Sequence, residues 1–154
     1  MLQDHAARTS VDAATNSIVL TRTFAAPREK VFDAWTQPQH VIRWWDPTGQ
    51  RLKDCTIDLR PNGVFNFVMS DGHQVPAFTG VYKEIARPER LVFEAMGALG
   101  RVELTSLNGR TLMTVTIQCS SPEHLERFLQ QGIDKGTAMT LNNLVAYLDG
   151  EPNN

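Results

Sequence analysis

The sequence predicts an α+β domain in which an antiparallel sheet of six to seven strands wraps around a long C-terminal helix, with two short helices after the first strand. Three observations support this prediction. Short alternating segments fill the middle of the chain, two proline-initiated helical patterns follow the first of them, and a long helical pattern ends the chain. Antiparallel sheets usually bury one face, so the helices should cover that face.

The two short helices contain all three tryptophans of the chain. Pro27 and Pro38 each stand where a helix can begin, because the first helical position needs no N–H group. Trp35, Trp44 and Trp45 follow them. A helix pair this short cannot bury three indole rings by itself, so it must pack against a large apolar surface elsewhere in the domain.

The strands are separated by recognisable turns. Asn108-Gly109 is the clearest two-residue hairpin turn, and Asp71-Gly72 is a second strong hairpin signal. The alternation is ambiguous in one segment, where Phe78 and Tyr82 compete with Val81 and Ile85 for the buried face, so a β-bulge is expected there. The expected strands cover residues 17–24, 55–59, 64–70, 76–86, 90–96, 101–107 and 110–119.

A single long helix is expected from the cap at Ser121-Pro122 to about residue 148, with Gly150 ending it. On one face it carries two glycines four residues apart, Gly132 and Gly136. A glycine inside a helix costs about 0.5–1 kcal/mol relative to alanine, so something should approach this face closely. Close packing against the sheet is one interpretation, and space for a ligand is the other.

Several short motifs occur in order between residues 17 and 150. They are Phe24-Ala25-Ala26-Pro27, Val31-Phe32-Asp33-Ala34-Trp35-Thr36, Trp44-Trp45, Gly80-Val81-Tyr82-Lys83-Glu84-Ile85, Pro88-Glu89-Arg90-Leu91-Val92-Phe93, Asn108-Gly109-Arg110-Thr111, and Gly132-Ile133-Asp134-Lys135-Gly136 followed by Leu141, Leu144 and Leu148. This set resembles the AHSA-type domain, the group of heat-shock-protein ATPase activator homologues in the START-like, or SRPBCC, superfamily. The resemblance implies the helix-grip fold, with a cavity between the long helix and the sheet, but a fold does not fix a function.

Length and composition indicate one soluble domain. The 154 residues suffice for a sizeable core, and the net charge of −2 gives no basic footprint, so no nucleic-acid partner is expected. No apolar run approaches the roughly 20 residues that cross a bilayer, so no membrane insertion is expected. Residues 1–16 lack a secretory pattern and are interpreted as a flexible arm before a single domain over residues 17–150.

The two cysteines, Cys55 and Cys119, fall in expected strands. We interpret them as free, buried thiols in a cytoplasmic protein, because a free cysteine packs as a small hydrophobic residue. A single inter-strand disulfide is the alternative.

No motif for metal binding or catalysis is evident. The histidines have no His-Glu-x-x-His spacing, and the chain has neither a Gly-x-Ser-x-Gly elbow nor a phosphate-binding glycine loop. We therefore expect no metal, no cofactor and no catalytic residue. Glu84 is the best candidate for an exception, because its strand has an uncertain register. A carboxylate turned into an apolar cavity would have a raised pKa and could act as an acid or base.

The main hypothesis is that the protein binds a small hydrophobic or amphipathic molecule in a cavity between the sheet and the C-terminal helix. Aromatic and methionine side chains line adaptable apolar pockets, although each one could also be plain core. Tyr82 and Asn143 could orient a polar group. The candidate ligand-binding residues are Trp44, Trp45, Phe65, Phe67, Met69, Phe78, Tyr82, Phe93, Met113, Phe128, Gly132, Gly136, Met139 and Asn143.

Two alternative functions remain open. The resemblance implies that the same cavity could serve an enzyme of the cyclase or aromatase type, which a buried titratable side chain would favour. The name of the resembling group implies a third function, that of a co-chaperone or protein-interaction module. The chain is expected to be a monomer or a homodimer.

Overall fold

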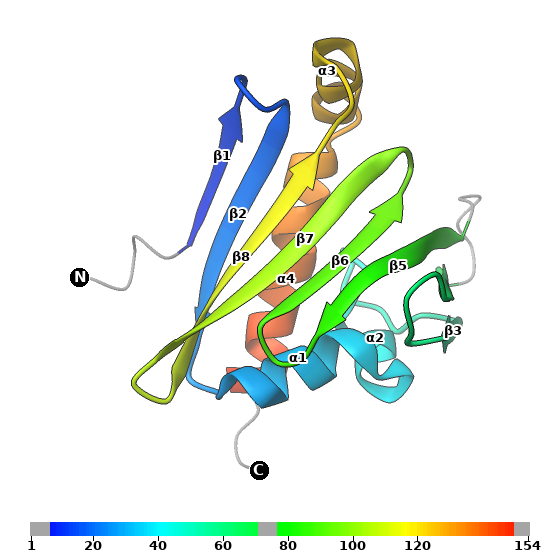
Figure 1. Cartoon of the computed structure of the whole chain (residues 1–154). Coiled ribbons are helices and arrows are strands. Elements are labelled where there is room, and N and C mark those ends of the chain that lie inside the picture. The colour runs from blue at the N-terminus through cyan, green and yellow to red at the C-terminus, as the bar shows by residue number, and fades with distance from the viewer. Residues whose placement is uncertain (1–6, 71–76, 150–154) are drawn as a thin grey trace.

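The computed structural model describes residues 7–70 and 77–149, and Figure 1 shows their arrangement. The expected turn at Asp71-Gly72 and the helix end at Gly150 lie outside these residues. One antiparallel sheet has the strand order β1-β2-β8-β7-β6-β5-β4-β3. The strands are β1 (Arg8–Asp12), β2 (Ser17–Phe24), β3 (Asp54–Ile57), β4 (Val64–Val68), β5 (Phe78–Ala86), β6 (Arg90–Ala95), β7 (Ala98–Leu107) and β8 (Arg110–Gln118).

The helices lie against one face of this sheet. Figure 1 shows α4 behind β7 and β8, with α1 and α2 near its C-terminal end and α3 at the opposite end. The helix α4 packs on β2 and on α2. The helices are α1 (Arg28–Thr36), α2 (Pro38–Trp44), α3 (Pro122–Gln130) and α4 (Ile133–Asp149). In the described part of the chain, none of them has the length and apolar character needed to cross a membrane.

The sheet has eight strands in the described residues, more than the six to seven that we expected. The additional strand β1 lies in the segment that the sequence predicted to be a flexible arm. Every residue of β1 is exposed, and the strand pairs antiparallel with β2 at the edge of the sheet. An exposed edge strand needs no apolar alternation, so its polar sequence gave no signal.

The strands bury one face of the sheet, as the alternating segments of the sequence predict. Ile18 and Leu20 of β2 are fully buried, and Phe65, Val102 and Met113 on other strands are at most 2% exposed. The expected bulge is confirmed as a register shift in the pairing of β5 with β6, between residues 82 and 84.

The hairpin at Asn108-Gly109 is also confirmed. Leu107 pairs with Arg110 across the turn, and the turn joins β7 and β8 near the centre of the sheet. Asn108 has a φ of 53° and Gly109 a φ of 85°. A type I′ turn requires positive φ at both central residues, which this dipeptide adopts readily.

Of the two prolines expected at first helical positions, Pro38 takes that position and Pro27 is the N-cap of α1. Pro38 is the first residue of α2, and Pro27 immediately precedes the first residue of α1. The indole N–H of Trp44 donates to the carbonyl of Ala34 at 3.0 Å, which fastens α2 to α1. Trp35 is only 6% exposed, so the helix pair buries its tryptophans partly among themselves and partly against the sheet.

Our prediction of a single long C-terminal helix is wrong. The structure has two helices, α3 and α4, separated at Gln131 and Gly132. Gly132 has a φ of +74° and its N–H donates to the carbonyl of Leu129, as in a glycine that ends a helix. Its own carbonyl then accepts from the N–H of Gly136, which starts α4. The glycine therefore ends one helix and begins the next.

Both cysteines are free, as expected. Cys119 is buried directly after β8, and Cys55 is half-buried in β3. Burial disfavours the thiolate and raises the pKa of Cys55 to about 11, so this thiol stays neutral near pH 7.

Replacing Gly109 by valine should destabilise the fold by roughly 1–3 kcal/mol. Nothing lies within 4 Å of a Cβ at this position, so the loss would come from backbone strain at positive φ and not from a clash. Urea denaturation of Gly109→Val measures the loss. Gly109→Asn is the control, because asparagine tolerates positive φ and should lose clearly less. Equal midpoints for Gly109→Val and the parent protein would contradict the turn assignment.

Candidate ligand-binding cavity

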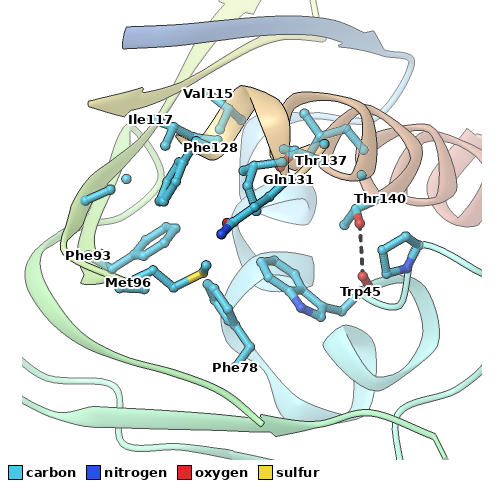
Figure 2. A pocket seen from close by; sticks show the side chains of 18 of the residues that line it. Trp45, Phe78, Phe93, Met96, Val115, Ile117, Phe128, Gln131, Thr137 and Thr140 are labelled. Carbon is cyan, nitrogen blue, oxygen red and sulfur yellow. Dashed lines mark hydrogen bonds between the residues drawn. The ribbon is translucent and has the colours of Figure 1, made fainter. Parts of the chain in front are cut away.

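A cavity of about 370 Å³ lies between the sheet and the two C-terminal helices (Figure 2). The helix pair α1 and α2 borders one end of it through Trp35 and Trp45, and the strands β5 to β8 supply one wall. Its described lining consists of Trp35, Trp45, Pro47, Met69, Phe78, Phe93, Ala95, Met96, Ala98, Gly100, Val115, Ile117, Phe128, Gln131, Gly132, Ile133, Gly136, Thr137, Thr140 and Leu141.

Aromatic rings form two sides of the cavity. In Figure 2, Phe93 and Phe128 lie on one side, and Trp45 and Phe78 lie on the other. The centroids of the Trp45 and Phe78 rings are 5.1 Å apart, and Trp45 also contacts Phe67 at 5.0 Å. These separations are typical of aromatic pairs, so the rings support one another as well as bordering the space.

The position of Trp45 is fixed by hydrogen bonds from α4. The hydroxyl of Thr140 donates to the carbonyl of Trp45 at 3.1 Å, as Figure 2 shows. The side-chain amide of Asn143 donates to the carbonyl of Asp46 at 3.0 Å and approaches that of Trp44 at 3.5 Å. The last carbonyls of a helix lack donors within the helix, and here the side chains of Thr140 and Asn143 act as the donors.

The two glycines border the cavity in different ways. Gly132 lies at the junction of α3 and α4, where its positive φ is required. Gly136 lies in the first turn and a half of α4, and a Cβ placed there would meet nothing within 4 Å. Close packing against the sheet therefore does not explain Gly136, since the space beside it is open.

Three polar side chains lie among the apolar ones. Gln131, Thr137 and Thr140 all come from the end of α3 or from α4. Thr140 is already engaged with Trp45. Gln131 is exposed at its position between the helices, and Figure 2 shows its amide extending between Phe93 and Trp45. The cavity is thus apolar with a polar group near its opening.

None of the described lining residues has a titratable side chain. Glu84, our candidate acid or base, does not face the cavity. Its side chain is exposed and its carboxylate accepts a hydrogen bond from Arg90 at 2.8 Å, which lowers the pKa of Glu84. Tyr82 is 2% exposed, and burial raises its pKa above its ordinary value. In the described part of the chain, no cluster of three His, Cys, Asp or Glu residues could hold a metal ion.

Half of the fourteen residues predicted from the sequence line the cavity. These seven residues are Trp45, Met69, Phe78, Phe93, Phe128, Gly132 and Gly136. Whether they contact a ligand stays a prediction.

The other seven do not line it, for three physical reasons. Trp44 and Met113 are buried in the core around it, at 1% and 0% exposed. Met139 is 52% exposed on the outer side of α4, and the side-chain amide of Asn143 donates to the carbonyls of Trp44 and Asp46. The aromatic side chains Phe65, Phe67 and Tyr82 border a separate small space of about 10 Å³ behind the aromatic wall.

The sequence missed two kinds of lining residue. Val115 and Ile117 of β8 line the cavity but were not among the predicted ligand-binding residues. Gln131 was missed because its place depends on the helix break at Gly132, whereas Thr137 and Thr140 lie in α4 close after Gly136 and were not considered. The signal for that break was present, since a glycine after several helical turns is a common helix end.

The comparisons with known proteins agree with this architecture. The profile of the family described as "Activator of Hsp90 ATPase homolog 1-like protein" matches residues 25–149. The chain belongs to this family. It is therefore an AHSA-type domain of the SRPBCC superfamily, as the motifs indicated. No curated protein matches the chain.

Several solved structures share the fold of this AHSA-type domain. A protein from Nitrosomonas europaea is 24% identical with a TM-score of 0.80, covering 94% of this chain and 100% of its own. A protein from Arthrobacter aurescens is 21% identical with a TM-score of 0.83, covering 97% of this chain and 94% of its own. One from Mycobacterium smegmatis is 21% identical with a TM-score of 0.78, covering 92% and 96%. Identities this low establish the fold alone.

Substitution of Gly136 separates open space from close packing. Gly136→Ala should stabilise the protein by about 0.5–1 kcal/mol, because alanine favours the helix and its methyl group meets no atom. Gly136→Leu should be at least as stable as the parent protein, since its side chain enters the cavity. Thermal unfolding of both variants provides the measurement. A loss of roughly 1–3 kcal/mol for Gly136→Leu would instead indicate overpacking and would contradict the geometry.

Proposed function

We propose that this AHSA-type domain binds a small apolar or amphipathic molecule in the cavity between the sheet and the C-terminal helices. The observation that carries the proposal is the open space beside Gly136, which aromatic side chains surround. A helix that only had to pack on the sheet would favour a larger residue there, because each buried methylene contributes about 0.8 kcal/mol.

The volume and chemistry of the cavity support a small-molecule ligand. Small-molecule sites are mostly apolar clefts of about 300–1,000 Å³ with a few polar groups, and the cavity of about 370 Å³ lies at the small end of that range. Its lining combines two methionines, Met69 and Met96, with five aromatic side chains, which are Trp35, Trp45, Phe78, Phe93 and Phe128. Methionine adapts its shape to different apolar partners.

Binding is preferred over the two alternatives. A cyclase or aromatase that uses side-chain acid–base chemistry would need a titratable group in the cavity, and the described lining supplies none. A co-chaperone role rests on the family description alone. Fold membership by itself supports neither function.

Fluorescence of N-phenyl-1-naphthylamine, an uncharged dye that brightens in apolar sites, tests the proposal. The parent protein should bind the dye saturably with one site per chain. Gly136→Leu should lose most of this binding, because its side chain fills the cavity.

Lys135→Leu is the matched control. Lys135 is the neighbouring residue on α4, is exposed and does not line the cavity, so the same new side chain there should leave dye binding unchanged. Saturable binding that survives in Gly136→Leu would place the dye elsewhere, and no saturable binding in the parent protein would refute the proposal. Native mass spectrometry of freshly purified protein would then show whether any small molecule copurifies.

A further inference from the structure

We infer that the ligand of this cavity is an uncharged, flat aromatic molecule whose one hydrogen-bonding group meets the side-chain amide of Gln131. The inference rests on the proposed function and makes it specific. It follows from three properties of the cavity: the charge of its lining, the arrangement of its rings and the place of the side-chain amide of Gln131.

The lining favours an uncharged ligand. Its described residues include no lysine, arginine, histidine, aspartate or glutamate, so none of these side chains would offset the charge of an ionised ligand. Moving an unpaired charge from water into apolar surroundings costs far more than moving a neutral polar group. A carboxylate or ammonium group would therefore have to remain outside, in water.

The arrangement of the rings favours a flat aromatic ligand. Phe93 and Phe128 lie across the space from Trp45 and Phe78 in Figure 2, so the space is bordered by ring surfaces on two sides. Aromatic pairs in stacked or edge-to-face contact gain about 0.5–1.5 kcal/mol beyond the burial of their surface. A flat ring system between these walls would make such contacts on both sides, whereas a branched aliphatic chain would not.

The place of Gln131 determines where the polar group of the ligand would lie. A glutamine amide offers two donor hydrogens and one acceptor oxygen, and no hydrogen bond engages the Gln131 side chain within residues 7–70 and 77–149. Its amide extends between Phe93 and Trp45, as Figure 2 shows, while its residue remains partly open to solvent. A ligand that enters with its apolar end first would bring a hydroxyl or carbonyl group to this amide.

Calorimetric titration with three matched probes tests the inference at neutral pH. Naphthalene has no polar group, 2-naphthol adds an uncharged hydroxyl, and 2-naphthoate adds an ionised carboxylate. The parent protein should bind 2-naphthol roughly 2- to 10-fold more tightly than naphthalene, as expected for one hydrogen bond. It should bind 2-naphthoate at least about 10-fold more weakly than 2-naphthol.

Two variants assign the preference to one side chain. In Gln131→Met the preference for 2-naphthol over naphthalene should disappear, while the affinity for naphthalene stays within about 2-fold of the parent value, because methionine retains the apolar stem. Gln130→Met is the matched control. Gln130 precedes Gln131 in the chain, is exposed and does not line the cavity, so this variant should keep the preference.

The possible outcomes separate this inference from the proposed function. Binding of naphthalene with no preference for 2-naphthol would overturn the inference and leave the binding function standing. A preference that survives in Gln131→Met, or tight binding of 2-naphthoate, would overturn it in the same way. Failure of all three probes to bind would overturn both.

Discussion

The contact between α4 and the carbonyl end of α2 is the constraint on which the cavity depends. Thr140 donates to the carbonyl of Trp45, and Asn143 donates to those of Trp44 and Asp46, at or just after the C-terminal end of α2, where carbonyls lack partners within the helix. The carbonyl of Asp46 also accepts from the N–H of Gly49 at 2.9 Å. Unpaired polar groups in a buried place are costly, so these bonds hold the two elements at a defined separation. The same bonds hold the backbone of Trp45 against α4, and the indole of Trp45 borders the cavity.

The break at Gly132 completes this arrangement. A continuous helix would carry the residues of α3 away along the axis of α4, whereas the turn at Gly132 allows α3 to cover the end of the cavity with Phe128. The absence of a side chain at Gly136 then leaves the middle open. Three features therefore shape the cavity: the hydrogen bonds between α4 and the end of α2, the break between α3 and α4 at Gly132, and the absence of a side chain at Gly136. Protein interiors are usually close-packed, so a space of this size is unusual for a plain core.

Sequence patterns predicted the parts of this structure that depend on local rules. Alternation located the buried face of the sheet, and Asn108-Gly109 located its central hairpin, because both signals are contained within a few residues. The edge strand β1 lacked a signal, since it buries nothing. Met139 and Asn143 share α4 with Gly136, but Met139 is exposed and the amide of Asn143 is bonded to the carbonyls of Trp44 and Asp46, which the sequence did not indicate. The position of Gln131 at the cavity depends on the break between α3 and α4 at Gly132, so it could be recognised only from the three-dimensional structure.

The most direct test of the account is a two-dimensional ¹H–¹⁵N spectrum recorded while 2-naphthol is added. The account predicts saturable shifts in the indole signal of Trp45 and in the backbone amide signals of Gly132 and Gly136, which border the cavity. The indole signal of Trp44 should barely move, because that N–H is bonded to Ala34 behind the wall. Saturable shifts confined to the outer face of the sheet, with these cavity signals unchanged, would contradict the account.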